Sequence, residues 1–374
     1  MAGEEKAVES VRSAEELAQD SIAWATQHGL VMRLGGDSPQ AAVIHAPMTL
    51  LPTPFPKEPF VQAVEVMPIL NRLVDAVSRD SAFLKSVLSS AAQYDDFTAN
   101  LLELNDATMA SSRQTDSSEV VVGVHRSDYM LDEPSGKLLQ VELNTIASSF
   151  GSLGSIVSQL HAHNTAQQAG MGPDGVPANA ALAECVIALA TAYNAVDLEH
   201  SVVLMVVESD EQNYYDQQWI ASQLWDVYSI RTVRKTLADI ASEGNLDDSG
   251  NLRCGDHCVA VAYFRSGYSP DHYPTSRQWD GRRLIESSTA AKCPTVAYHL
   301  AGTKKVQQQL ARPGVLEQFL EEEDAFHVRK FFAGLWGLED LSDPETQRTV
   351  QEAISHPEKF VLKPQREGGG NNLY

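Results

Sequence analysis

Residues 363–374, KPQREGGGNNLY, combine charged side chains with a run of glycines. Consecutive glycines let backbone N–H groups approach a phosphate closely, because no side chain stands between them. Lys363 and Arg366 can offset phosphate charge, and Glu367 can hold Mg²⁺, which prefers oxygen ligands and bridges phosphates. The spacing is not that of the GxxxxGKS or GxxxxGKT phosphate loop. A flexible glycine linker is the ordinary alternative, but the charged side chains after an apolar stretch favour a phosphate site.

Glu142 and Asn144 stand two positions apart in LLQVELN, residues 138–144. In a strand this spacing points both side chains to one face, where two oxygen ligands suit Mg²⁺ shared with a nucleotide. Arg126, near the end of the expected partner strand, could clamp a carboxylate. Each also has an ordinary explanation, because Glu and Asn are common at exposed strand ends and Arg can form a strand-edge salt bridge. The residues alone leave both explanations open.

Polar side chains also follow two apolar runs. Arg265-Ser-Gly-Tyr268 comes directly after CVAVAYF, residues 258–264, and Glu211, Asn213 and Gln217 follow SVVLMVV, residues 201–207. In open α/β sheets ligands bind beyond the carboxyl ends of the strands, so Arg265 is placed to meet an anion. Solvated loops explain both clusters about equally well.

Lys304 and Lys305 open a predicted helix after Gly302 and Thr303. Lysines at a helix start oppose the helix dipole unless an anion is near. This conflict hints at a nucleotide phosphate, although an exposed lysine pair is the commoner explanation.

The elements that must position these residues follow from the hydrophobic pattern. The valine-rich stretch and the turn signal DEPSGK predict a hairpin with strands near 119–126 and 137–144. The apolar runs at 201–207 and 258–264 are typical of buried parallel strands, and the strand–helix–strand alternation predicts an α/β domain between 200 and 300.

Shorter signals mark further elements. Ser13 and Glu16 resemble a capping box in a helix over 9–28. We expect a short strand at 228–233 and a last strand at 360–363, which runs into the glycine-rich segment.

Composition excludes several classes of protein. A net charge of −22 repels phosphate backbones, so nucleic-acid binding is not expected. No run of eighteen apolar residues predicts a membrane span, and the acidic N-terminal stretch is unlike a signal or transit peptide, which favours a cytoplasmic protein. Cys254, His257 and Cys258 resemble half of a zinc site, but no second ligand pair stands at suitable spacing.

Taken in order, these motifs resemble the eukaryotic glutathione synthetase family along nearly the whole chain. The motifs are RSDYM at 126–130, QVELNTIASSFG at 140–151, EQNYYDQ at 211–217, YFRSGY at 263–268, AAKCP at 290–294, LAGTKKVQQQL at 300–310 and KPQREGGGNNLY at 363–374. Members are ATP-grasp ligases that join γ-glutamylcysteine to glycine while ATP becomes ADP and phosphate. The resemblance implies that the dipeptide carboxylate is phosphorylated to an acyl phosphate, which the glycine amine then attacks.

The resemblance also implies a fold and a division of the chain. It implies an α/β (α+β) ATP-grasp fold with an inserted α/β substrate-binding domain and with the C-terminal part missing. The expected domains are the N-terminal part of the ATP-grasp core at 1–197, the substrate-binding domain at 198–303, and an incomplete start of the ATP-binding lobe at 304–374. It further implies a homodimer with bound Mg²⁺ and with ATP as co-substrate.

Site residues are carried over motif by motif. The resemblance implies Arg126 as a catalytic residue and Glu142, Asn144 and Glu367 as metal ligands. The implied ATP contacts are Glu142, Lys304, Lys363, Gln365, Arg366, Glu367, Gly368, Gly369, Gly370, Asn371, Asn372 and Tyr374. The implied contacts to γ-glutamylcysteine are Arg126, Ile146, Ala147, Ser148, Ser149, Glu211, Gln212, Asn213, Gln217, Arg265, Ser266, Gly267 and Tyr268.

The sequence departs from the family pattern in two places. Ser266 stands where animal members tend to have Asp, which weakens a side-chain contact there. Family chains also continue beyond the motif at 363–374, so we expect this sequence to be a C-terminally truncated fragment of the enzyme. The alternatives are a homoglutathione-type ligase that uses β-alanine, and an inactive truncated binding partner of the full-length enzyme.

Overall fold

The structure, a computed structural model, describes residues 12–36, 38–39, 41–110, 119–167, 175–364 and 372–373. The chain forms two compact units, each assembled from separate stretches. Unit 1 comprises Met1–Phe55, Ser149–Ala190 and Ser209–Thr232, and unit 2 comprises Pro56–Ser148, Thr191–Glu208 and Val233–Tyr374. The predicted division at residues 198 and 304 stays a prediction, because these units follow compactness and not function.

Unit 1 is mostly helical. Its elements are α1 (Ala14–Gln27), β1 (Val31–Arg33), β2 (Val43–His45), α5 (Gly151–Ala166), α7 (Tyr214–Tyr228) and the first part of α6 (Ala181–Val196). The predicted capping box is confirmed, since the Ser13 side chain accepts from Glu16 N and the Glu16 side chain accepts from Ser13 N. A small core that includes Leu30, Ile156 and Leu160 joins α1 to α5.

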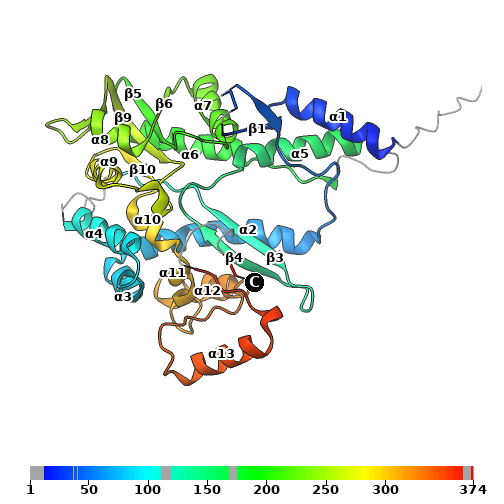
Figure 1. Ribbon diagram of the computed structural model, residues 1–374, viewed down its shortest axis with the longest axis vertical. Coiled ribbons are helices and arrows are strands. Elements are labelled where there is room, and N and C mark those ends of the chain that lie inside the picture. The colour runs from blue at the N-terminus through cyan, green and yellow to red at the C-terminus, as the bar shows by residue number, and fades with distance from the viewer. Residues whose placement is uncertain are drawn as a thin grey trace, which may run out of the picture. The chain divides into compact units, whose positions relative to one another are not determined.

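Unit 2 contains a mixed sheet (Figure 1). Its strands are β5 (Ser201–Val206), β6 (Thr232–Lys235), β7 (Gly244–Leu246), β8 (Leu252–Cys254), β9 (His257–Phe264) and β10 (Ala291–Cys293). The strand order is β6-β5-β9-β8-β7, with β10 parallel to β9. Every residue of β5 is buried, as its continuous apolar run predicts, and β5 runs parallel to β9.

Helices and a hairpin complete unit 2. The helices are α2 (Lys57–Arg79), α3 (Ser81–Ala92), α4 (Asp96–Ala110), α8 (Leu237–Glu243), α9 (Ser276–Glu286), α10 (Val296–Ala301), α11 (Lys304–Leu310), α12 (Glu322–Arg329) and α13 (Pro344–Ser355), with 3₁₀ turns at Pro270–His272, Leu316–Gln318 and Pro357–Lys359. The hairpin pairs β3 (Arg126–Leu131) with β4 (Leu138–Asn144). One apolar cluster, to which Leu70, Leu143, Phe264 and Val306 belong, connects α2, the hairpin, the sheet and α11.

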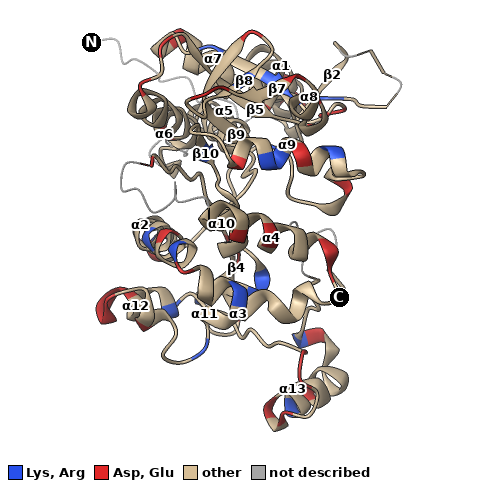
Figure 2. Ribbon diagram, turned by 90° about the vertical axis from the view of Figure 1, so that its left-hand side faces the viewer, with Lys and Arg blue, Asp and Glu red and all other residues tan. Residues whose placement is uncertain are grey.

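The chain carries a net charge of −22, and acidic residues lie on helices such as α12 and α13 (Figure 2). The first turn of α12 alone carries Glu322, Glu323 and Asp324. Carboxylates at a helix N-terminus interact favourably with the helix dipole, so these three acidic residues stabilise α12.

The predicted hairpin exists, but its first strand is displaced. β3 begins at Arg126, whereas the expectation placed Arg126 near a strand end. The hairpin closes tightly because Gly136, with φ +66°, brings its N–H to Asp132 O at 2.7 Å. The valine run therefore lies outside the hairpin, and Val121 instead forms a parallel bridge with Lys292.

Two other predicted strands are also corrected. The strand expected at 228–233 lies at Thr232–Lys235, because α7 continues to Tyr228 and ends at Ser229 in a left-handed conformation. Residues 360–363 are not a strand: among the described residues, Leu362 forms a single bridge, with Leu373.

Candidate active site

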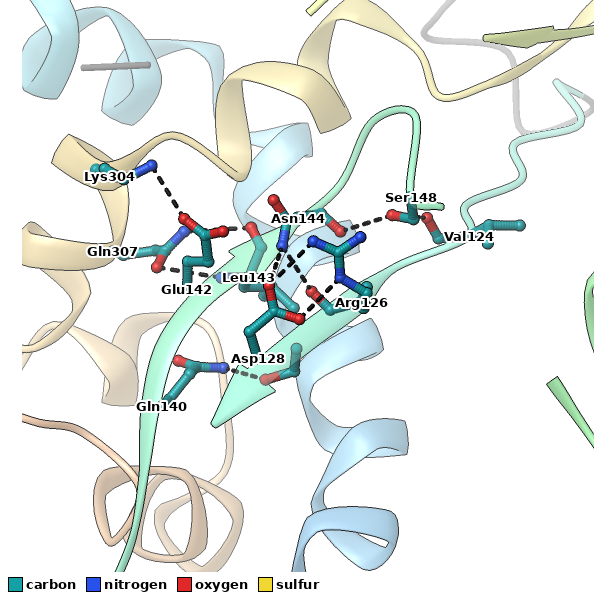
Figure 3. A network of polar contacts seen from close by, with 11 residues as sticks. Val124, Arg126, Asp128, Gln140, Glu142, Leu143, Asn144, Ser148, Lys304 and Gln307 are labelled. Atoms are coloured by element: carbon teal, nitrogen blue, oxygen red, sulfur yellow. Dashed lines mark hydrogen bonds and ion pairs between the residues drawn. The ribbon is translucent and has the colours of Figure 1, made fainter. Parts of the chain in front are cut away.

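Four polar side chains face one another across the hairpin. In the register of β3 and β4, Arg126 lies opposite Asn144, and Asp128 lies opposite Glu142. Directly opposed residues on one face of an antiparallel pair are close enough to interact. The hairpin therefore brings the predicted carboxylate clamp and two predicted metal ligands together (Figure 3).

A bulge in β4 decides which side chains share that face. The register shifts after Asp128, so that Val141 is an extra residue between the paired positions of Glu142 and Gln140. Gln140 Nε2 donates to Ser127 Oγ at 2.7 Å, whereas Asn144 Nδ2 donates to Asp128 at 3.0 Å. One inserted residue moves a side chain to the other face of a strand. The bulge thus separates Gln140 from the polar face.

Asp128 is the centre of this polar face. Its Oδ1 accepts from Arg126 Nε at 2.8 Å, and its Oδ2 accepts from Arg126 Nη2 at 3.0 Å. Its Oδ2 also accepts from Asn144 Nδ2, which donates in addition to Arg126 O at 3.3 Å. The strand salt bridge considered as the ordinary explanation for Arg126 is therefore present, and it is part of the same cluster.

Lys304 meets Glu142 from the first turn of α11. Its Nζ lies 3.1 Å from Glu142 Oε2, and the two side chains are 12% and 9% exposed. Gln307 fixes the helix beside β4, because its side chain accepts from Leu143 N at 3.3 Å and donates to Leu143 O at 3.2 Å. The anion expected near the N-terminal lysines is, in this structure, a carboxylate of the chain itself.

Lys363 reaches the same strand from the C-terminal segment. Its Nζ donates to the carbonyl of the bulged residue Val141 at 2.9 Å. Burial lowers the pKa of Lys363, the nearby charge of Lys304 lowers it further, and Glu142 opposes both effects. Backbone hydrogen bonds of 3.0 and 2.9 Å join Leu362, directly before the predicted phosphate segment, to Leu373, near the end of that segment.

Most of that segment lies outside the described residues. The predicted ATP and metal contacts that lie outside the described residues are Gln365, Arg366, Glu367, Gly368, Gly369, Gly370, Asn371 and Tyr374. Asn372 is described and is half-buried. Within the described ranges no group of three His, Cys, Asp or Glu side chains could hold a metal ion. Glu142 and Asn144 offer a carboxylate and a carboxamide oxygen, the hard donors that suit Mg²⁺.

The loop after β4 has an unusual backbone. Ile146 is buried, and Ala147 has a φ of +50°, which is uncommon for a residue with a side chain. Ser148 Oγ donates to Val124 O at 3.0 Å and to Asn144 O at 3.2 Å. These contacts hold the loop against the end of the hairpin.

The loop at 265–268 is also held firmly within unit 2. Arg265 is buried, its N–H donates to Val206 O at 2.8 Å, and Ser266 donates to Glu208. Gly267, with φ +86°, donates its N–H to His272 Nδ1 at 3.1 Å. Any side chain at 267 would be strained there, so the sequence Ser-Gly suits the turn. Tyr268 packs its ring edge against His272.

The other predicted substrate contacts lie in unit 1. Glu211 accepts from Asn213 N at 2.7 Å and from Gln217 Nε2 at 2.6 Å, which brings these three together. Gln212 O accepts from Arg33 N at 3.1 Å. Ser149 is the first residue of another stretch of unit 1, Ser149–Ala190.

Sequence reasoning missed three residues that organise these regions. Buried Asp216 accepts the N–H groups of Phe150, Ser152 and Leu153 at 3.0–3.1 Å and so caps α5. The sequence did contain a signal for Asp128: it stands two positions from Arg126, and this spacing places both side chains on one face of a strand. Gln307 and Asp216 had none, since their partners are distant in sequence.

A cleft of about 1070 Å³ lies elsewhere in unit 2, between α2 and the segment that leads into α12. Its lining is rich in carboxylates, and none of the predicted site residues contributes to it. In the described residues, no helix has the length and apolar content to cross a membrane.

The lysines and oxygen ligands around β4 suit the phosphates and the metal ion that an ATP-dependent ligase binds. The chain matches the family model "Eukaryotic glutathione synthase, ATP binding domain" over residues 12–374. The chain belongs to the eukaryotic glutathione synthase family, whose members are ATP-dependent ligases. The predicted family is confirmed, and so is its α/β ATP-grasp fold class.

Curated relatives are similar over almost all of this chain. It is 43% identical to the chloroplastic glutathione synthetase of Arabidopsis thaliana over 369 residues, which cover 96% of this chain and 67% of that one. It is 44% identical to the chloroplastic glutathione synthetase of Solanum lycopersicum (96% and 66% covered) and 38% identical to the glutathione synthetase of Homo sapiens (96% and 76%). The chain thus spans about two thirds of the length of these plant relatives.

A solved structure has the same fold. It is a glutathione synthetase-like effector from Globodera pallida in its apo form, with a TM-score of 0.75 and 23% identity, covering 96% of this chain and 75% of that one. At this identity the likeness supports the fold alone.

Proposed function

We propose that this chain carries out ATP-dependent joining of γ-glutamylcysteine to glycine, which yields glutathione, ADP and phosphate. The observation that carries the proposal is the convergence of Lys304, Lys363 and Glu142 at the end of β4. Two cations beside a strand can neutralise a nucleotide's phosphates, and a carboxylate between them can hold a metal ion.

The reaction needs charge neutralisation more than a covalent nucleophile. A carboxylate oxygen of the dipeptide attacks the γ-phosphorus of ATP, and the bond to ADP breaks. The glycine amine then attacks the acyl carbon, phosphate leaves, and the amine loses a proton. Both steps bring anions together, so positioning and cationic side chains supply most of the acceleration.

We assign the metal position to Glu142 and Asn144, with Glu367 as the third ligand. When bound there, Mg²⁺ would neutralise negative charge on the nucleotide's phosphates. In this structure Lys304 is the cation that balances Glu142. A divalent ion at Glu142 would compete for this carboxylate, which would make Lys304 available to a phosphate.

We assign the dipeptide to the remaining predicted residues. Arg126 and Arg265 offer guanidinium groups for its carboxylates. The other proposed contacts are Ile146, Ala147, Ser148, Ser149, Glu211, Gln212, Asn213, Gln217, Ser266, Gly267 and Tyr268. The proposed ATP contacts are those predicted from the sequence: Glu142, Lys304, Lys363, Gln365, Arg366, Glu367, Gly368, Gly369, Gly370, Asn371, Asn372 and Tyr374.

The test is phosphate release with ATP, γ-glutamylcysteine and glycine. It uses the 374-residue chain and the translation product of its natural transcript side by side. We expect release that requires the dipeptide, and we expect Glu367→Ala to abolish it. Replacing glycine by β-alanine distinguishes a homoglutathione-type ligase. Absence of release from both folded proteins would contradict the proposal and leave the binding-partner alternative.

The assembly and the compartment are parts of the same proposal. We propose a cytoplasmic homodimer, although the plant relatives are named chloroplastic. Light scattering of the purified protein gives its mass in solution, and a fluorescent fusion expressed from the natural gene gives its compartment.

A further inference from the structure

Asp128 is shared by two residues to which the proposed function gives different ligands. Arg126 would bind the dipeptide, and Asn144 would bind the metal ion. Both donate to the same carboxylate, at 2.8 and 3.0 Å from Arg126 and at 3.0 Å from Asn144 (Figure 3). No sequence motif gave Asp128 a role, so its function has to come from this geometry.

The first consequence concerns the carboxamide of Asn144. A carboxamide has a donor end and an acceptor end, whereas an ionised carboxylate only accepts. Asn144 Nδ2 faces two acceptors, Asp128 Oδ2 and Arg126 O. The amide nitrogen must therefore occupy this side, and the oxygen is the atom presented as a metal ligand. Without the negative charge at 128, only Arg126 O still disfavours the reversed carboxamide.

The second consequence concerns the guanidinium of Arg126. Two hydrogen bonds to the two oxygens of one carboxylate fix both the position and the plane of a guanidinium. The Arg126 and Asp128 side chains are still 38% and 32% exposed. An exposed pair adds little to stability, so its main effect is to order the arginine before a ligand arrives.

The charges on this face are also paired in an ordered way. Asp128 lies opposite Glu142 in the register, and two carboxylates directly opposed on a sheet repel each other. Each has its own cation, Arg126 for Asp128 and Lys304 for Glu142. A neutral residue at 128 would avoid this repulsion. The carboxylate therefore adds order to the site at an electrostatic cost.

We infer that Asp128 is a positioning residue of the proposed reaction: it orders Arg126 for the dipeptide carboxylate and turns the carboxamide oxygen of Asn144 toward the metal ion. The inference rests on the proposed function. It predicts that one substitution weakens two different ligands, which a residue with a merely structural role would not do selectively.

The experiment measures binding, so that it does not depend on turnover. The probes are Mn²⁺ in the presence of ADP, followed by the paramagnetic resonance signal of free Mn²⁺, and γ-glutamylcysteine, followed by calorimetry. Asp128→Asn is expected to weaken the binding of Mn²⁺ about tenfold or more, because the metal ligand Asn144 loses the residue that orients it. The same variant is expected to bind γ-glutamylcysteine about tenfold more weakly, because Arg126 loses its charged partner.

Two further variants make the result specific. Asp132→Asn makes the same chemical change in the turn of the same hairpin, where Asp132 accepts from Ser135 N at 3.2 Å. It is expected to leave both affinities within about twofold, since an exposed turn carries no ligand group. The exchange variant Asp128→Asn with Asn144→Asp restores a donor–acceptor pair in reverse. It is expected to recover Mn²⁺ binding but not dipeptide binding.

Each remaining outcome overturns a stated part. If Asp128→Asn binds both probes as the wild type does, or changes them no more than Asp132→Asn, the positioning role is wrong. If the exchange variant fails to recover Mn²⁺ while folded, the account of Asn144 is wrong. If the folded wild type binds neither probe, the proposed function fails and this inference fails with it. If the wild type binds both probes and Asp128→Asn binds them equally well, the inference is wrong but the proposed function stands.

Discussion

Unit 2 holds ion pairs in two very different surroundings. On the hairpin, the side chains of Arg126 and Asp128 are 38% and 32% exposed. Beneath the loop at 265–268, Arg282 and Glu286 are completely buried, with Nε and Oε1 2.8 Å apart. The Arg282 guanidinium lies over the ring of Phe264, 3.9 Å from its centre.

The difference teaches which charges stabilise the fold and which serve ligands. A fully buried pair has lost its hydration, so removing one partner leaves a charge with no compensation. A partly exposed pair keeps much of its hydration and contributes little net stability. We therefore expect changes at Glu286 to act on folding, and changes at Arg126 or Asp128 to act on binding and turnover.

The largest effect is expected at the buried pair. Glu286→Gln should lower the free energy of unfolding by about 3–5 kcal/mol, because Arg282 stays charged in an apolar region. Denaturant unfolding measures this change. The control is Asp280→Asn on the same helix. Asp280 Oδ1 lies 3.0 Å from Arg283 Nη1, and the Asp280 side chain is 62% exposed. A loss below 1 kcal/mol for Glu286→Gln would contradict the distinction.

The next effect is expected on the hairpin face. Glu142→Ala should lower kcat/KM for phosphate release by about 100-fold or more, since a charge that stabilises the bound ion is lost. The melting temperature should fall as well, because Lys304 loses its partner in a largely buried position, but by less than in Glu286→Gln, whose pair is completely buried. The matched control is Glu133→Ala, an exposed carboxylate in the turn of the same hairpin. Equal activity losses in both variants would show that the hairpin, and not the carboxylate, is what matters.

A pH effect of intermediate size is expected from His125, which is half-buried. Burial lowers the pKa of His125 from 6.5 to about 4. The unfolded chain therefore binds a proton below pH 6.5 that the folded chain does not, and stability falls as the pH falls from 6.5 toward 4. Between pH 7 and pH 5 the loss from this group is about 2 kcal/mol.

Denaturant unfolding at these two pH values checks the histidine prediction. His125→Phe should reduce the difference between pH 7 and pH 5, because it removes the titrating ring. His356→Phe is the control, since His356 is exposed and its ring is hydrated in the folded chain also. An unchanged difference in His125→Phe would mean that another group causes the acid sensitivity. Carboxylates with lowered pKa values, such as Asp75 and Glu339, lose their contribution only at lower pH.

The smallest effect is expected at a surface pair between helices. Lys85 Nζ lies 2.6 Å from Asp106 Oδ2, and the two side chains are 64% and 41% exposed. Lys85→Ala should lower the free energy of unfolding by less than about 1 kcal/mol, and salt should reduce the effect further. Unfolding at low and high ionic strength measures this. A loss as large as that of Glu286→Gln would contradict the dependence on burial.

Periodicity predicted the parts of the site that depend on one strand alone. Glu142 and Asn144 share a face because the bulge at Val141 precedes both and leaves their spacing unchanged. The buried strands β5 and β9 were predictable from their continuous apolar runs. These features need no knowledge of a distant partner.

The parts that depend on pairing were not predictable. The valine run has a higher strand propensity than RSDYM, yet Val121 bridges Lys292 and the hairpin uses Arg126–Leu131. Register is set by the turn and by tertiary contacts, so Arg126 could not be placed opposite Asn144 in advance. The contact of Gln307 with Leu143 likewise depends on packing between segments far apart in sequence.

The central claim is that a carboxylate of the dipeptide is phosphorylated by ATP. Incubation with γ-glutamylcysteine labelled with ¹⁸O in its cysteine carboxylate, together with ATP and glycine, tests it most directly. The account predicts that the phosphate released carries one ¹⁸O, because the attacking oxygen stays on phosphorus when the amide forms. Phosphate release without ¹⁸O, or release that does not require the dipeptide, would contradict it.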